Sequence, residues 1–365
     1  MTKRFTVAVA ALAMASACLP AQAFAQFAHE PFFDNAVELS QAYGLESIGL
    51  RLDLAAAFAA PYDDELIETI EGVSGPAYQR FGGTLQARDA DLAMALSAAL
   101  HEVEEAVEDG ADPAEAIAEA RGLLAKAYDV VIPAELRDSA AFKGGVLIQL
   151  LLAEEGVAEG YEEAVEGNEP WEYPNGWAAL QRVKILWDEI KGDASAERLA
   201  DGQEMLDLLD TLYPQAEPPA SLAGLNPEEA EGPAQRLGGI IEDVTNADLY
   251  PGRDVSRLVG HLGELTSAAC NVYAQDDDVA VETIYAVFDL YDANVEKVAS
   301  MFAAEAQERA SESFEYMIAG DDEDDEGAAN AETAVIAEDD TVLSAAEACG
   351  ELAAALAELK TAFGG

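Results

Sequence analysis

The sequence predicts an all-α protein. Apolar residues recur at intervals of three and four in nearly every segment, strand-like alternation is scarce, and Ala, Leu and Glu dominate the composition. Apolar side chains at this spacing share one face of a helix. Half of the 365 residues are apolar, which is enough for one large domain or for two domains that each bury a core.

The first helices are expected from their apolar stripes and from their start and stop signals. A stripe over 92–107 predicts one helix, and Asp112-Pro113 is typical of the start of the next helix, which ends at Pro133. A third helix is expected over 140–165, where apolar residues again follow one face.

Similar signals occur in the second half of the chain. Asn226-Pro227 predicts another helix start, and the apolar stripe from 255 to 272 predicts the helix that follows. A long helix is expected over 279–318, and a final amphipathic helix over 342–365 is expected to dock onto the rest of the protein.

An internal duplication is the most informative feature of the sequence. The segment GPAYQRFGG at 75–83 recurs, one residue shorter, as GPAQRLGG at 232–239. Leu-Asp-Leu precedes both copies, and His-x-x-Glu follows both copies. This common order predicts two related helical bundles.

The duplication suggests a division of the chain. We expect a signal peptide over 1–25, a first bundle over 26–167, a Trp-containing connecting helix over 168–195, a second bundle over 196–320, an acidic linker over 321–341 and a C-terminal helix over 342–365. The linker is expected to be solvated because it is acidic, rich in Ala and Gly, and without periodicity.

The N-terminal residues have the features of a secretory signal. Lys3 and Arg4 precede a short apolar stretch, and the small residues of 21–25 suit a signal peptidase. An alternative is a lipid anchor on Cys18. No later apolar run reaches the ~18 residues that a membrane span needs. We therefore expect a soluble exported protein, periplasmic or secreted.

The charge balance narrows the choice of partners. The chain has 72 Asp and Glu against 19 Lys and Arg, a formal net charge of −53. Nucleic-acid backbones and anionic membrane surfaces are nearly excluded as partners, because a protein binds either of these anionic surfaces through its own Lys and Arg side chains. Adaptation to a salty habitat explains the same acidity without any cation-binding role.

After removal of a signal, two cysteines remain. Cys270 and Cys349 are able to pair in an oxidising compartment, which would tie the last helix to an internal one. The alternative is two small buried apolar residues. The sequence leaves both open.

Two pairs of residues are candidates for cation binding. Residues three apart share one helix face, so His101 with Glu104 and His261 with Glu264 each offer an imidazole and a carboxylate. The alternative is a surface histidine beside a helical glutamate. Arg257, four residues before His261, opposes a cation at the second pair.

Two further carboxylates interrupt apolar stripes. Glu154 falls on the stripe of the 140–165 helix, and Glu305 falls on that of the 279–318 helix. A carboxylate that faces a core is costly unless it is paired, protonated or bound to a metal. Acidic ridges beside them, such as Glu159 with Glu162, suit iron, manganese or calcium. The alternative places these residues at the edges of the stripes.

The sequence lacks the GxSxG, Walker, Rossmann and HExxH motifs, so we expect a non-enzymatic protein. An all-helical, exported chain of this length with two related bundles resembles the imelysin-like proteins, which include periplasmic accessory proteins of bacterial iron uptake. The two His-x-x-Glu pairs carry the resemblance. The family motif has glycine two residues before the histidine, where this chain has Ala99 and Val259.

The resemblance implies a metal-linked, non-hydrolytic binding role with the two pairs as the metal site. The first functional hypothesis is therefore a protein that binds iron or another divalent cation for uptake or delivery. The second is a scaffold or adaptor that binds another envelope protein through helical grooves, with Trp171 and Trp177 on the contact surface.

Overall fold

The computed structural model describes residues 35–58, 67, 70, 75–153, 156–167, 170–249, 255–273, 278–318 and 345–364. All regular structure in these residues is helical, which confirms the all-α prediction. The expected signal peptide with Cys18, the acidic linker and Glu154 lie outside the described residues. None of the described helices combines the length and the hydropathy that crossing a membrane requires.

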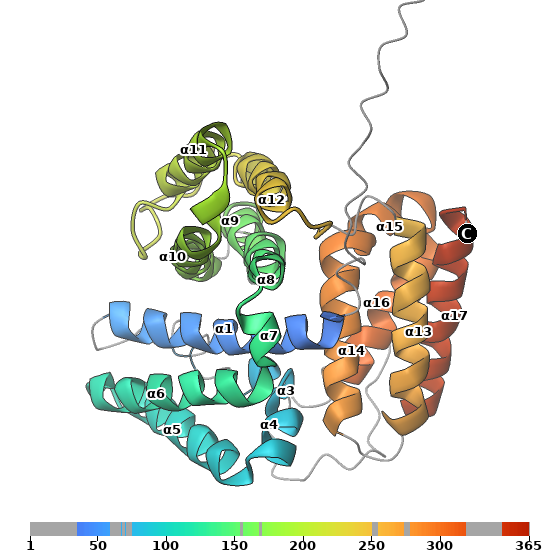
Figure 1. Ribbon diagram of the computed structural model, residues 1–365, viewed down its shortest axis with the longest axis horizontal. Helices are drawn as coiled ribbons and strands as arrows, with labels where there is room; N and C mark the ends of the chain where they lie inside the picture. Colours follow the sequence, from blue (N-terminus) through green and yellow to red (C-terminus); the bar gives the residue numbers. More distant parts are fainter. Residues whose placement is uncertain are drawn as a thin grey trace, which may run out of the picture.

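The apolar side chains form two clusters, and these define two bodies (Figure 1). The first body contains α1 (Ala36–Ala57), α3 (Pro76–Gln79), α4 (Gly82–Arg88), α5 (Ala90–Glu108), α6 (Ala114–Val131), α7 (Ala134–Arg137), α8 (Ala140–Leu152), α9 (Val157–Glu166), α10 (Glu172–Ile190), η3 (Lys191–Asp193), α11 (Ala196–Leu212), η4 (Pro227–Glu229) and α12 (Glu231–Thr245). The second body contains α13 (Val255–Tyr273), α14 (Asp278–Tyr291), the π-helical turn η6 (Asp292–Glu296), α15 (Lys297–Phe302), α16 (Ala304–Ile318) and α17 (Ala345–Ala362).

The two bodies do not coincide with the two expected bundles. The first cluster extends to Leu249, and the second begins at Leu258 apart from Ala36. Residues 196–249, which the sequence pattern placed in the second bundle, therefore pack with the first body. The expected connecting helix also lies within the first body, where α10 packs against α1, α8 and α9.

α1 is the central helix of the first body. It lies between α3 and α6 on one side and α8 and α10 on the other, and its first residues reach α14 (Figure 1). Most of its residues are buried, including polar Ser40, Gln41, Glu46 and Ser47. A helix that is buried on nearly all sides has no solvated face, so its polar groups need partners inside the protein.

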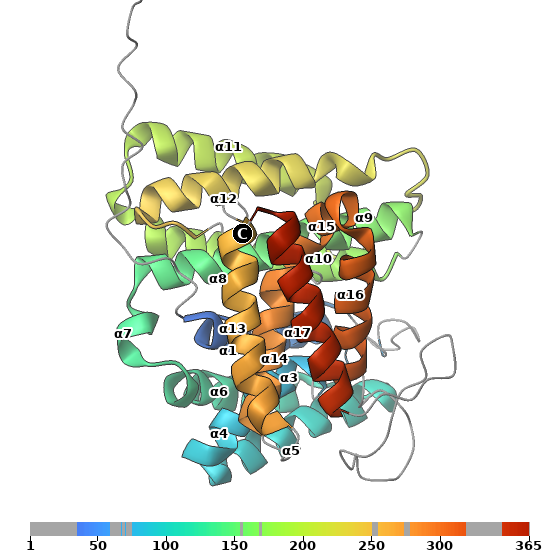
Figure 2. The same cartoon turned by 90° about the vertical axis from the view of Figure 1, so that its right-hand side faces the viewer.

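The second body is a bundle of α13, α14, α16 and α17 (Figure 2). The C-terminal helix docks as expected, because α17 packs against α13 and α16. A disulfide between Cys270 of α13 and Cys349 of α17 crosslinks two of these helices, with 5.7 Å between the Cα atoms. Of the two alternatives for these cysteines, the structure therefore shows the disulfide.

Two helices that were expected to be continuous are broken. The expected 140–165 helix is divided into two, because α8 ends at Leu152 and α9 begins at Val157. The expected 279–318 helix contains the π-helical turn and then breaks at Ala303, whose backbone has φ −153° and ψ 53°. The extra residue of a π turn and the break both rotate the face of the following helix, so apolar spacing read across them loses its register.

Candidate functional site

The first His-x-x-Glu pair lies on the surface of α5. His101 is exposed and Glu104 is buried. Nδ1 of His101 lies 3.5 Å from Oε2 of Glu104, and Nε2 lies 3.4 Å from Oε1 of Glu105. The imidazole is thus flanked by two carboxylates, one at each ring nitrogen. An ion bound to one nitrogen gains one of these carboxylates, not both.

The second pair lies on α13, in the other body. His261 is half-buried and Glu264 is exposed. Glu305 is also exposed, because the break at Ala303 turns the start of α16 outward, so its carboxylate does not face the core. Within the described residues, no group of three or more His, Cys, Asp and Glu is arranged to hold a metal ion.

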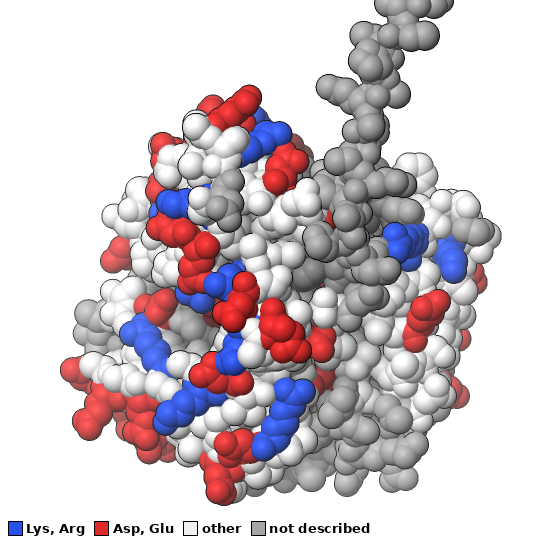
Figure 3. Space-filling view, viewed as in Figure 1, with Lys and Arg blue, Asp and Glu red and all other residues white. Residues whose placement is uncertain are grey.

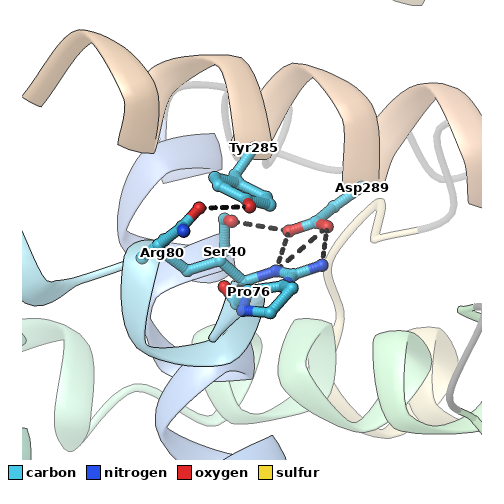
Figure 4. Close-up of polar contacts among 6 residues, drawn as sticks. Ser40, Pro76, Arg80, Tyr285 and Asp289 are labelled. Atoms are coloured by element: carbon cyan, nitrogen blue, oxygen red, sulfur yellow. Dashed lines mark hydrogen bonds and ion pairs between the residues drawn. The ribbon is translucent and has the colours of Figure 1, made fainter. Parts of the chain in front are cut away.

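A buried polar network that the sequence analysis missed joins the two bodies (Figure 4). Nε and Nη2 of Arg80 donate to Oδ1 of Asp289 at 3.3 and 3.0 Å, and Oγ of Ser40 donates to Oδ2 at 2.5 Å. The guanidinium lies 4.8 Å from the ring centroid of Tyr285 and 5.4 Å from that of Tyr43. Charged and aromatic contacts of this kind are strong when water is excluded.

A second buried carboxylate extends this network along α14. Glu282 accepts hydrogen bonds from the backbone nitrogen of Thr84 at 2.6 Å, from Oγ1 of Thr84 at 2.6 Å and from Nε2 of Gln41 at 2.8 Å. The hydroxyl of Tyr285 donates to Oε1 of Gln79 at 2.6 Å. Three polar residues of α14, at positions i, i+3 and i+7, therefore face α1, α3 and α4.

We call the set Ser40, Gln41, Arg80, Thr84, Glu282 and Asp289 the interface network. Its carboxylates are occupied by donors of the protein itself, and its members are all at most 9% exposed. Such an arrangement fixes the two bodies relative to each other. It presents no exposed reactive group to a substrate.

The duplicated segment contributes to the network in one copy only. Arg80 belongs to the copy at 75–83 and is buried, whereas the matching Arg236 is exposed on α12. The first copy is divided between α3 and α4, whereas the second copy lies entirely within α12. The only sequence signal for the network was this arginine in a repeated motif, together with the polar spacing on α14.

The acidic ridge on α9 lies at another contact between the bodies. Lys297 of α15 lies 3.7 Å from Glu231 of α12. Burial raises the pKa of Glu159, the negative charge of Glu162 raises it further, and Lys297 opposes the shift. Burial alone lowers the pKa of Lys297, but Glu162 and Glu231 outweigh burial and raise it. These carboxylates therefore already interact with a cation of the protein, Lys297.

Among the described residues, the large apolar side chains with the highest exposed fractions lie at the break between α15 and α16. Met301 is 68% exposed and Phe302 is 70% exposed. Beside them is a hollow of about 700 Å³ between the first turn of α16 and the last turns of α17. We call this hollow the α16–α17 groove; its lining residues are Ala303, Ala304, Glu305, Ala306, Ala357, Glu358, Thr361 and Ala362.

None of the three tryptophans lines the α16–α17 groove. Trp187 is buried, while Trp171 and Trp177 are half-buried. Trp177 lines a second hollow of about 550 Å³, together with Lys184, Asp210 and the loop after α11. Trp171 and Trp177 therefore each keep only part of their surface accessible for contact.

The surface charge is mixed on one face of the first body. Lys and Arg side chains lie among Asp and Glu there, and the described part of the second body shows few charges in the same view (Figure 3). Many basic side chains are held in ion pairs with carboxylates: Arg80, Arg121, Arg137, Lys143, Arg182, Lys184, Lys191, Arg198, Lys297 and Arg309.

The fold and the interface network define an all-α protein of two helical bodies joined through a buried polar contact. Comparison with family models, with curated proteins and with solved structures finds no match for this chain. Function is therefore inferred from the geometry alone.

Proposed function

We propose that this chain is an exported, non-catalytic scaffold that binds another protein of the cell envelope through its helical surface. The observation that supports this proposal is the exposure of Met301 and Phe302 beside the α16–α17 groove. Large apolar side chains gathered at one place on a monomer are typical of interaction sites. Isolated exposed apolar residues, such as Met94 on α5, need no such explanation.

The interface network supports the same proposal. A scaffold has to present its surface in one geometry, because each group that is ordered only on binding lowers the affinity. The contacts of Arg80 and Glu282 hold α14, and with it the second body, against α1 and α4. The binding surface is thereby carried on a preorganised framework.

Capture from an envelope extract of the source organism tests the proposal. The immobilised full chain is expected to retain a protein in a saturable manner, and Phe302→Ser with Met301→Ser is expected to abolish this retention. Met94→Ser is the matched control, because Met94 is also highly exposed, at 61%, but lies on α5. Equal capture by both variants, or no saturable capture by the wild-type chain, would contradict the scaffold function.

A second candidate function is cation binding at His101. Two metal–ligand bonds of ~2.1 Å at a tetrahedral angle place their donor atoms ~3.4 Å apart. The 3.5 Å between Nδ1 of His101 and Oε2 of Glu104 matches this separation. Two protein ligands favour weak, exchangeable binding, which suits delivery of iron or another divalent cation. The iron-uptake role implied by the imelysin-like resemblance rests on this candidate.

Calorimetry with Fe²⁺, Mn²⁺, Zn²⁺ and Ca²⁺ at moderate salt tests the second candidate. Saturable heat is expected for at least one ion and is expected to disappear in His101→Ala. His261→Ala is the matched control, because it removes the histidine of the other body. No saturable heat for any of the four ions, or equal loss in both variants, would contradict a site at His101.

A further inference from the structure

We infer that the α16–α17 groove receives a cationic amphipathic helix of the partner, with its apolar face on Met301 and Phe302 and its basic residues on the carboxylates of the rim. This inference deepens the proposed scaffold function and rests on it. It follows from the shape, the chemistry and the charge of the groove.

The shape of the groove suits a helix. Its walls are mostly alanines, contributed by the start of α16 and the end of α17. Side chains this small leave a channel between the two helices instead of a filled ridge, and helices pack by placing the ridges of one into the grooves of another. The start of α16 and the end of α17, which line the groove, lie at the end of the bundle where α15 and the C-terminus are found (Figure 2).

The apolar anchor lies at one end of this channel. Phe302 contacts Phe363 edge-on, with 6.4 Å between the ring centroids, so its ring is steadied while most of its surface stays exposed. Met301 precedes it and is equally exposed. A rigid aromatic ring beside a flexible methionine accepts the apolar side chains of a helix at i, i+3 and i+4 spacing.

The charge of the groove selects a basic partner. Glu305 and Glu358 line it, while Lys360 lies on the other side of α17, over Gly260 of α13. Arg309 binds Glu358 and also lies 3.7 Å from Glu351, so its single charge is shared between two carboxylates. Opposite charge steers association, and it disfavours wrong partners of like charge.

The same charge argues against two other occupants. A second copy of this chain carries the same net charge of −53, so pairing two such grooves brings like charges together. An anionic lipid surface is repelled for the same reason. A helix with Lys or Arg on one face and Leu or Phe on the other satisfies both parts of the groove.

The test uses the full chain and a labelled 18-residue helical peptide of Leu and Lys, with Leu at i, i+3 and i+4 spacing. Fluorescence anisotropy is expected to show saturable binding that weakens with salt. Met301→Ser with Phe302→Ser is expected to weaken binding by about tenfold or more. Glu305→Gln is expected to weaken it less and to reduce its salt dependence, while Met94→Ser leaves it unchanged.

Four controls accompany the binding measurement. A peptide of the same composition in scrambled order, and one with Glu in place of Lys, are both expected to bind poorly. Equal binding of the scrambled peptide, or equal binding by the Met301 and Phe302 double variant, would overturn the inference. Binding to phosphatidylglycerol vesicles that depends on Phe302 would overturn it too, in favour of a membrane. Circular dichroism checks that each variant is folded.

The failure of this inference is distinguishable from the failure of the scaffold function. If the chain captures an envelope protein through Phe302 and the Lys peptide does not displace it, the scaffold function stands and the cationic helix is wrong. If no envelope protein is captured at all, the scaffold function itself fails.

Discussion

Replacing Asp289 by Ala tests whether the interface network holds the two bodies together. Asp289 is 3% exposed and is the counter-ion of Arg80, which is 8% exposed. The substitution removes the acceptor of both guanidinium bonds and of the Ser40 hydroxyl. Arg80 then remains buried without the counter-ion Asp289, which costs much more stability than the loss of an exposed ion pair.

The expected loss of stability depends on the contacts that Arg80 keeps in the Asp289→Ala variant. Breaking a buried ion pair by removing one partner costs about 3–5 kcal/mol. Arg80 retains the bond from Nη1 to the carbonyl oxygen of Pro76 at 3.1 Å and its two tyrosine rings, so we expect the lower end, about 3 kcal/mol. Asp188→Ala, which breaks an exposed pair with Lys191, is the control and is expected to cost about 0–1 kcal/mol.

The assay is urea unfolding of the full chain, followed by two probes. Tryptophan fluorescence reports on the first body, which contains Trp171, Trp177 and Trp187, and far-UV circular dichroism reports on both bodies. In the Asp289 variant the two transitions are expected to separate, because the second body loses its contact with α1. A destabilisation below about 1 kcal/mol with superimposed transitions would refute the role of the network.

A double replacement separates the ion pair from simple loss of packing. Arg80→Met with Asp289→Leu removes both charges and keeps apolar volume at the interface. Such replacements are often neutral or stabilising, so the double variant is expected to recover most of the loss. If the double variant is as unstable as Asp289→Ala alone, the cost arises from the loss of packing and not from the loss of the ion pair.

Three further outcomes are expected. Cys270→Ser with Cys349→Ser removes a crosslink between residues that are 79 positions apart. The chain-entropy relation predicts that the free energy of unfolding, measured in urea under oxidising conditions, falls by about 4.5 kcal/mol. A decrease below about 1 kcal/mol would contradict this expectation. Gly202→Ala places a Cβ 2.5 Å from the Trp187 ring. The overpacking is expected to lower the free energy of unfolding by about 1–3 kcal/mol and to change the tryptophan fluorescence. An unchanged midpoint of urea unfolding would contradict the close contact. Glu159→Gln is expected to raise the free energy of unfolding at pH 7 by less than about 1 kcal/mol. Because burial raises the pKa of Glu159, the folded state binds its proton more tightly, so the gain should vanish below pH 4.5 in a series of unfolding curves.

The interface network shows why part of the site escaped prediction. Arg80, Glu282 and Asp289 each lie in a helical pattern where charged residues are ordinarily solvated. Their partners are about 200 residues away along the chain: Arg80 and Asp289 differ by 209 positions, and Thr84 and Glu282 by 198. No local spacing indicates such a pairing, so only the packing of α14 against α1 and α4 reveals it.

The exposed position of Glu305 has a related cause. In the sequence, the apolar residues from Ile284 to Phe302 recur with helical spacing, and the same spacing continues to Glu305. The π-helical turn and the break at Ala303 rotate the faces that follow, so the same spacing places Glu305 outside. The residues at this break include no Gly or Pro, so the sequence pattern does not predict it.

The sequence alone determined that this protein is helical, that α17 has an apolar face to bury, and that its two internal cysteines are a possible pair. These are properties of single residues and of spacing within one helix, where 3.6 residues per turn fixes which side chains share a face. The tertiary structure decided which faces meet. It placed 196–249 with the first body, buried one copy of the repeated arginine and exposed the other, and left Phe302 uncovered beside a groove. A helix face specifies that it needs a partner, but many faces in one chain satisfy that need equally, so the choice depends on packing over the whole molecule.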